Sequence, residues 1–324
     1  MSHFTVLVVG DDVEKQLAPF QENNMGDCPA EYLSFNEVEE EYLKEYENES
    51  VEMVQAPNGE LCYTWDDRFK VGADFFNRQT VIPQDYVTVQ VAHKDRYDNF
   101  EKFIQDWAGY KDQDPETGKY GYWANPQARW DWFQVGGRWT GFFKMKPEAE
   151  GSVGRPGLMT SPAEKGYADQ AYKKDIDFDG MRDEAGEKAG INYDKMLAVV
   201  GAHLEDFIPW DKMRDEVHGG NVESARTAYY DQAAKKALQA ATDQDLRWNN
   251  IEDFLCTREE YVEKARAKAI STFAVLMDGK WYKKGEMGWW ACVSNENADW
   301  SEEFGKLLDG ISDDTLLTVV DCHI

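Results

Sequence analysis

Apolar and β-branched residues form continuous runs near both ends of the chain. Phe4–Val9 (FTVLVV) is followed by Gly10, and Thr315–His323 (TLLTVVDCH) lies at the opposite end. Runs of this length and composition are typical of buried strands. Since strands at the ends of a chain are usually tied into a sheet, we expect these two segments to belong to one sheet.

Three internal segments also have strand-like patterns. Tyr86–Ala92 alternates apolar and polar residues, and Thr272–Met277 and Gly288–Val293 are short apolar runs. The last two flank the turn-rich segment DGKWYKKGEMG. This arrangement predicts an antiparallel hairpin between them, with Lys280–Tyr282 extending one arm.

Helical periodicity appears between these strands. Within Tyr97–Ala108, apolar residues recur at Phe100, Phe103, Ile104 and Trp107, a spacing that predicts an amphipathic helix packed on a sheet. Ser301 begins a second helical pattern, Ser301–Gly310, as a candidate N-cap. The order of elements predicts an α+β fold whose core is a small antiparallel or mixed sheet built from both chain ends. A ferredoxin-like sheet is one arrangement that fits this order.

Long insertions separate the two halves of this core. Asn36–Asn48 predicts a helix with Asn36 as its cap, Glu39 at the capping-box position, and Val38, Tyr42 and Tyr46 on one face. The opposite face is almost entirely glutamate. Asp183–Ile270 is rich in Ala, Lys, Glu and Asp and predicts a helical subdomain.

The chain therefore divides into four expected regions. Residues 1–146 form an N-terminal α+β region with the acidic helix and an aromatic-rich segment, and residues 147–180 form a linker or loop. Residues 181–270 form the helical subdomain, and residues 271–324 complete the sheet core. Pro147–Pro162, rich in proline and glycine, supports the linker assignment.

The charge balance narrows the classes of partner. The chain has 62 Asp and Glu against 35 Lys and Arg, a net charge of −27, and residues 1–60 hold 15 of the acidic and 2 of the basic residues. This balance disfavours direct binding to nucleic acid or an anionic membrane and favours a basic protein partner, although acidic surfaces also serve solubility alone. The absence of a long apolar segment predicts a cytoplasmic protein.

Catalytic and metal motifs are weak. Five scattered cysteines predict reduced thiols. DIDFDG (Asp175–Gly180) starts like a calcium loop, but Gly186 stands at the twelfth position where a glutamate is needed. His3, His93 and His323 lie at the ends of predicted strands. They fit two interpretations: polar residues at strand ends, or a cluster of imidazole metal ligands. We predict no catalytic site, no metal and no cofactor.

An aromatic-rich segment, Tyr122–Trp139 (YWANPQARWDWFQVGGRW), is the most distinctive stretch of the chain. The segment fits three roles: core packing, a protein-binding hot spot, or stacking on a ligand. Alternation places aromatic rings on both faces of a short strand, which favours burial and predicts that Trp130 and Trp132 are buried. The candidate scaffold or hot-spot residues are Trp123, Trp130, Trp132, Phe133 and Trp139.

Four fragments carry a family resemblance: MSHFTVLVVG, LAPFQEN, WDWFQVGGRW and VVDCHI. Together they resemble a family of phage-encoded proteins, and among phage proteins of this size and acidity the chain resembles the Gabija anti-defence proteins. The resemblance implies an oligomeric, non-enzymatic inhibitor in the host cytoplasm. It would enclose the host nuclease–helicase complex and stop it from engaging DNA.

The expected function is thus inhibition of a host defence complex by protein–protein contact. The partner would present a basic DNA-binding surface, and the candidate contacts are the glutamates of the acidic helix: Glu37, Glu39, Glu40, Glu41, Glu45 and Glu47. The alternatives are an enzyme acting on a nucleotide signal or host protein, and an accessory protein of phage DNA metabolism. A pocket with convergent His, Asp and Arg side chains would favour the enzyme.

Overall fold

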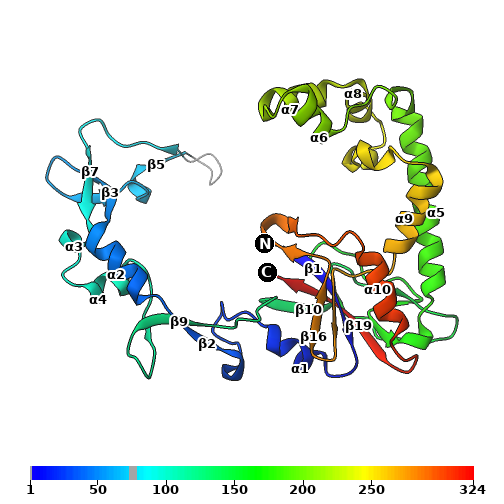
Figure 1. The fold of residues 1–324 in the computed structure, drawn as a ribbon, viewed down its shortest axis with the longest axis horizontal. Helices are drawn as coiled ribbons and strands as arrows, with labels where there is room; N and C mark the ends of the chain where they lie inside the picture. The colour runs from blue at the N-terminus through cyan, green and yellow to red at the C-terminus, as the bar shows by residue number, and fades with distance from the viewer. Residues whose placement is uncertain (1, 73–78) are drawn as a thin grey trace. The chain divides into compact units, whose positions relative to one another are not determined.

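The computed structural model describes residues 2–72 and 79–324 (Figure 1). The chain folds as two compact units. The first, which we call the sheet unit, combines Met1–Ala18 with Trp130–Ile324, and the second, the acidic unit, is Pro19–Arg129. The unit boundaries thus fall at residues 18/19 and 129/130, both within the stretch 1–146 that was expected to form a single N-terminal region.

The terminal strands pair with each other at the centre of the sheet unit. β1 (His3–Val9) runs antiparallel to β19 (Leu316–His323), from the pair His3 and His323 to the pair Val9 and Leu317. Both strands are almost completely buried. The prediction that the two chain ends build one sheet is confirmed, because β1 and β19 pair directly over seven residue pairs.

The hairpin beside β1 differs from the predicted one. β15 (Ala274–Met277) pairs with β16 (Lys280–Lys283), and Asp278 and Gly279 form the two-residue turn with φ of 51° and 69°. Asp-Gly is favoured in such turns because both residues have positive φ. Gly288–Val293 is therefore not the hairpin partner. The segment around it forms a separate small ladder of β17 (Glu286–Met287) with β18 (Val293–Ser294).

The full sheet is mixed. Its order is β12-β10-β19-β1-β15-β16, and β14 (Gln170–Tyr172) pairs with β19 beyond the end of β10 (Trp132–Gly137). β1 and β15 are parallel and directly paired. A ferredoxin-like sheet would separate two parallel strands by an antiparallel one. The fold is α+β as predicted, with a strand order that departs from the ferredoxin-like form.

One face of this sheet carries the main core. Leu7, Leu317 and Val319 on the central strands pack against Phe304 and Leu308 of α10 (Trp300–Asp309). α10 occupies the region of the predicted helix at Ser301–Gly310, with Asp299 rather than Ser301 at the N-cap position. Figure 1 shows α10 beside the sheet strands.

The segment expected as a linker is tied to the sheet. Within Pro147–Pro162, β12 (Arg155–Pro156) pairs in parallel with the end of β10, and Ser152 bridges to Gln170 of β14. Next to it, β11 (Phe143–Lys144) pairs with β13 (Tyr167–Ala168). Of the two predicted forms, linker or loop, these residues form an exposed loop of the sheet unit that backbone hydrogen bonds to neighbouring strands hold in place.

The sheet unit also contains a group of helices. These helices share a second hydrophobic core. They are α5 (Phe178–Val200), α6 (Trp210–Lys212), the π-helical turn Met213–Val217, α7 (Val222–Asp231), α8 (Ala233–Gln239) and α9 (Arg258–Lys268). α5 and α9 lie side by side (Figure 1). Asp177 of the DIDFDG segment caps α5 by accepting from the Gly180 N–H.

The acidic unit contains three small sheets and three α-helices in its described residues. The sheets are β2 (Ser34–Glu37), β9 (Tyr120–Ala124) and β8 (Asp112–Gln113); β4 (Leu61–Tyr63), β3 (Ser50–Gln55) and β7 (Val87–Ala92); and β5 (Lys70–Val71) with β6 (Gln79–Thr80). The helices are α2 (Glu39–Asn48), α3 (His93–Arg96) and α4 (Phe100–Asp106). Phe103 and Ile104 of α4 are fully buried, as the periodicity of Tyr97–Ala108 predicts.

None of the helices in the described residues has the length and hydrophobicity to cross a lipid bilayer.

Candidate functional site

A groove in the acidic unit runs along α2. Five glutamates and two lysines contribute to its walls, and the complete lining is Glu37, Val38, Glu40, Glu41, Lys44, Glu45, Glu49 and Lys119. Most of these residues come from α2 and the end of β2. An acidic groove of this kind offers carboxylates to a lysine or arginine side chain of a partner.

The position of the groove follows from the two faces of α2. Val38, Tyr42 and Tyr46 pack against the core around Phe103, as the helical spacing predicts. On the remaining surface of the helix, Glu40, Glu41 and Glu47 are exposed. Asn36 belongs to β2 and does not cap the helix, whose N-cap position is Val38.

Two of the six predicted contact glutamates are used inside the unit. A carboxylate oxygen of Glu39 accepts from the Tyr120 backbone N–H at 3.0 Å, and Glu45 accepts from the Trp107 indole N–H at 2.9 Å. Both side chains are half-buried. These hydrogen bonds hold α2 on β9 and on the end of α4, and a role of Glu39 and Glu45 as partner contacts stays a prediction.

The other four glutamates are exposed. Glu37 binds Lys119 at 2.8 Å and Glu40 binds Lys44 at 3.0 Å, and these hydrogen bonds lower the pKa of both carboxyl groups. Exposed ion pairs of this type contribute little stability and exchange readily with other partners. Among the described residues, Glu41 and Glu47 have no ion-pair partner.

The acidic unit is also the more highly charged portion of the chain. Pro19–Arg129 contains 10 Lys and Arg and 23 Asp and Glu, a net charge of −13 out of −27 for the whole protein. About half of the net charge thus lies on about a third of the residues. The groove on α2 is surrounded by a field that attracts cations and basic surfaces.

The aromatic-rich segment is divided between the two units. Trp123 lies in the acidic unit, where it contacts Phe35 edge-to-face at 5.1 Å. Trp130 begins the second portion of the sheet unit, and its indole N–H donates to the Leu17 carbonyl at 3.1 Å. Trp130 is 5% exposed, so its predicted burial is confirmed.

Trp132 is 44% exposed, and its predicted burial is wrong. It opens β10 at the end of the sheet face, beyond the residues that α10 covers, and stacks on the His323 ring at 5.3 Å and 15°. Phe133 is half-buried and contacts Trp130, and Trp139 is also half-buried. The segment therefore serves both as scaffold and as surface.

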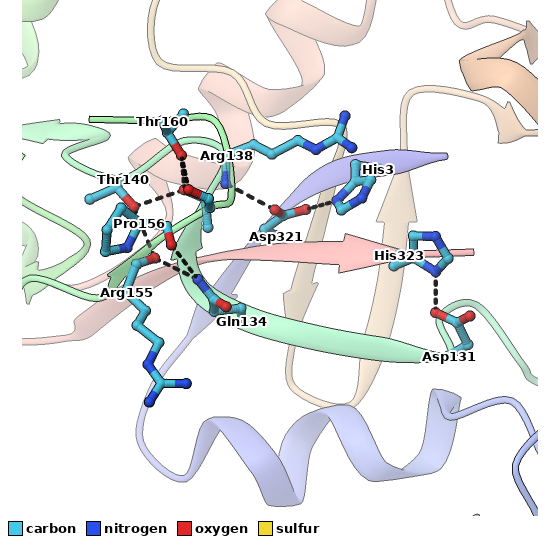
Figure 2. Close-up of polar contacts among 12 residues, drawn as sticks. His3, Asp131, Gln134, Arg138, Thr140, Arg155, Pro156, Thr160, Asp321 and His323 are labelled. Atoms are coloured by element: carbon cyan, nitrogen blue, oxygen red, sulfur yellow. Dashed lines mark hydrogen bonds and ion pairs between the residues drawn. The ribbon is translucent and has the colours of Figure 1, made fainter. Parts of the chain in front are cut away.

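The glycine pair in this segment, Gly136 and Gly137, makes room for two buried carboxylates, of which Asp321 is drawn in Figure 2. Gly137 has φ of 57°, and a Cβ there would lie 2.3 Å from the Asp321 side chain. A Cβ on Gly136 would lie 2.7 Å from an oxygen of Asp169. Asp321 accepts from the Arg138 N–H, and Asp169 accepts from three backbone N–H groups: Gly141, Phe142 and Gly154.

Beside this network, two histidines are each bound to an aspartate (Figure 2). His3 Nδ1 lies 2.8 Å from Asp321, and His323 Nδ1 lies 2.6 Å from Asp131. The two imidazole centres are 4.9 Å apart. His93 belongs to the acidic unit, where Phe103 and Trp107 surround it, so no three-imidazole cluster forms among the described residues of the sheet unit.

The sequence contains a signal for this pair. His3 and His323 lie at corresponding ends of two terminal strands, and antiparallel pairing brings such residues opposite each other. The aspartate partners could be recognised only in the structure. Within residues 2–72 and 79–324, no three His, Cys, Asp or Glu side chains are grouped to hold a metal ion.

Comparison with known proteins adds no assignment, since no family model, curated protein or solved structure matches the chain.

Proposed function

We propose that this protein is a phage-encoded, non-enzymatic inhibitor that binds a basic surface of a host defence complex. The observation that carries the proposal is the acidic groove on α2, which Glu41 lines, with Glu47 exposed on the same helix. The family resemblance supports the Gabija nuclease–helicase as the complex to test first. It also supports a homo-oligomer acting in the host cytoplasm.

The physical basis is competition for a basic DNA-binding surface. Such a surface gains much of its affinity for DNA by releasing counterions from phosphates. A folded protein unit of net charge −13 can occupy the same surface and block DNA. Electrostatic attraction also accelerates the encounter and makes binding sensitive to salt.

Charge reversal in the acidic unit tests this proposal. The double substitution Glu41→Lys and Glu47→Lys is expected to weaken co-purification of the host complex at low salt by about tenfold or more, because two attractive contacts become repulsive. The matched control is Glu187→Lys with Glu205→Lys, two exposed glutamates of the sheet unit. Equal losses in both double variants would assign the effect to net charge rather than to this surface.

The alternative function as an enzyme has one observation in its favour. Two imidazoles fixed by carboxylates could transfer protons to and from a substrate. Incubation of the purified protein with nucleotide signals tests it directly. Turnover that His3→Gln and His323→Gln both abolish would replace the inhibitor proposal.

A further inference from the structure

The two imidazoles at the end of the central strands have the same local arrangement. His3 and His323 are cross-strand partners, and each binds a carboxylate through Nδ1. A carboxylate can only accept, so each neutral ring carries its proton on Nδ1 and leaves a lone pair on Nε2. Neither Nε2 has a hydrogen-bond partner among the described residues.

Both rings are held in place by their surroundings. Asp321 is 1% exposed, and its second oxygen accepts from the Arg138 N–H at 2.9 Å. The Asp131 N–H donates to the His323 carbonyl, so this aspartate is bound to His323 through backbone and side chain. Histidines that bind metals almost always donate their other ring N–H to an acceptor, and a carboxylate is one of the three common acceptors, with backbone carbonyls and water.

The local charge selects the sign of the ligand. The charged groups that bind the two imidazoles are the carboxylates of Asp131 and Asp321, in a chain of net charge −27. A phosphate or carboxylate ligand would be repelled. A cation would be attracted, and neutral imidazole nitrogen suits divalent ions of the zinc, nickel and copper group.

We propose that His3 and His323 together bind one divalent transition-metal ion through their Nε2 atoms, with water in the remaining positions. Two imidazoles that share a tetrahedral ion at a metal–nitrogen distance near 2.0 Å have ring centres about 5 Å apart. The observed separation is 4.9 Å. Asp131 and Asp321 are positioning residues that fix the tautomer and orientation of each ring.

Calorimetric titration of tag-free, metal-free protein with Zn²⁺ tests the site. One ion is expected to bind per chain, Mg²⁺ is expected not to bind, and His3→Gln and His323→Gln should each remove the Zn²⁺ binding. The matched control, His203→Gln, changes an exposed histidine and should leave binding unchanged. Asp131→Asn should weaken binding by about tenfold or more while leaving its stoichiometry at one.

A second measurement uses the unmodified chain, so it does not depend on the folding of a variant. Zn²⁺ should protect His3 and His323 from acylation by diethyl pyrocarbonate, and His203 should remain reactive. Absence of 1:1 binding, or binding that survives both histidine substitutions and is lost in Cys292→Ser, would overturn the proposal. Cys292 is an exposed thiol and the obvious competing ligand. These outcomes do not depend on the inhibitor function.

Discussion

A buried ionisable group is fully hydrogen-bonded in the sheet unit and incompletely hydrogen-bonded in the acidic unit. In the sheet unit, Asp169 is fully buried and its carboxylate accepts from three backbone N–H groups. In the acidic unit, His93 is 2% exposed, its Nδ1 has no hydrogen-bond partner among the described residues, and Nε2 lies 3.6 Å from Glu45. A fully bonded polar network specifies one backbone arrangement, whereas an incompletely bonded group leaves stability dependent on its protonation state.

Of the three substitutions that test this difference, Gly137→Ala should have the largest effect on the free energy of unfolding. The substitution places a methyl group 2.3 Å from the Asp321 Cβ at a φ of 57°, so strain and steric overlap add. We expect a loss of about 4 kcal/mol in the free energy of unfolding, measured by urea denaturation. Gly166→Ala is the matched control, because φ is 90° there and a Cβ meets no atom within 4 Å. Similar losses in both variants would mean that the close approach to Asp321 contributes nothing.

Asp169→Asn should have the next largest effect. Its amide group keeps one acceptor oxygen and directs an NH₂ group at a backbone donor, so at least one buried N–H loses its partner. The expected loss is about 2–3 kcal/mol in the free energy of unfolding. Asp206→Asn, at an exposed position, should change stability by less than about 0.5 kcal/mol. Equal stability of the two variants would contradict a structural role for the Asp169 network.

His93→Phe should have the smallest effect and should appear only as a change in pH dependence. Burial lowers the pKa of His93, so the unfolded chain binds a proton more readily than the folded one. The stabilisation from neutral His93 is complete above the unfolded pKa of about 6.5 and is lost as the pH falls toward the folded value. Thermal unfolding between pH 7.5 and 5 should show a weaker decline in the variant. An unchanged pH slope would show that His93 does not carry this dependence.

The local pattern of residues determined much of the fold. The apolar runs at Phe4–Val9 and Thr315–His323 predicted two buried strands in one sheet, and the spacing of Val38, Tyr42 and Tyr46 predicted the buried face of α2. These features depend on period and hydrophobicity, which a single sequence contains. The excess of acidic over basic residues within residues 1–60 is likewise a property of composition.

Tertiary structure alone decided which side chains meet. An alternating pattern gives the face of a strand on which Trp132 lies, but not whether another element covers that end of the sheet, so its exposure could not be predicted. Glu39 and Glu45 could not be told from Glu41 and Glu47 because all four lie on one acidic helix. The pairing of His323 with Asp131 depends on the register of β10 against β19, which is set by long-range packing.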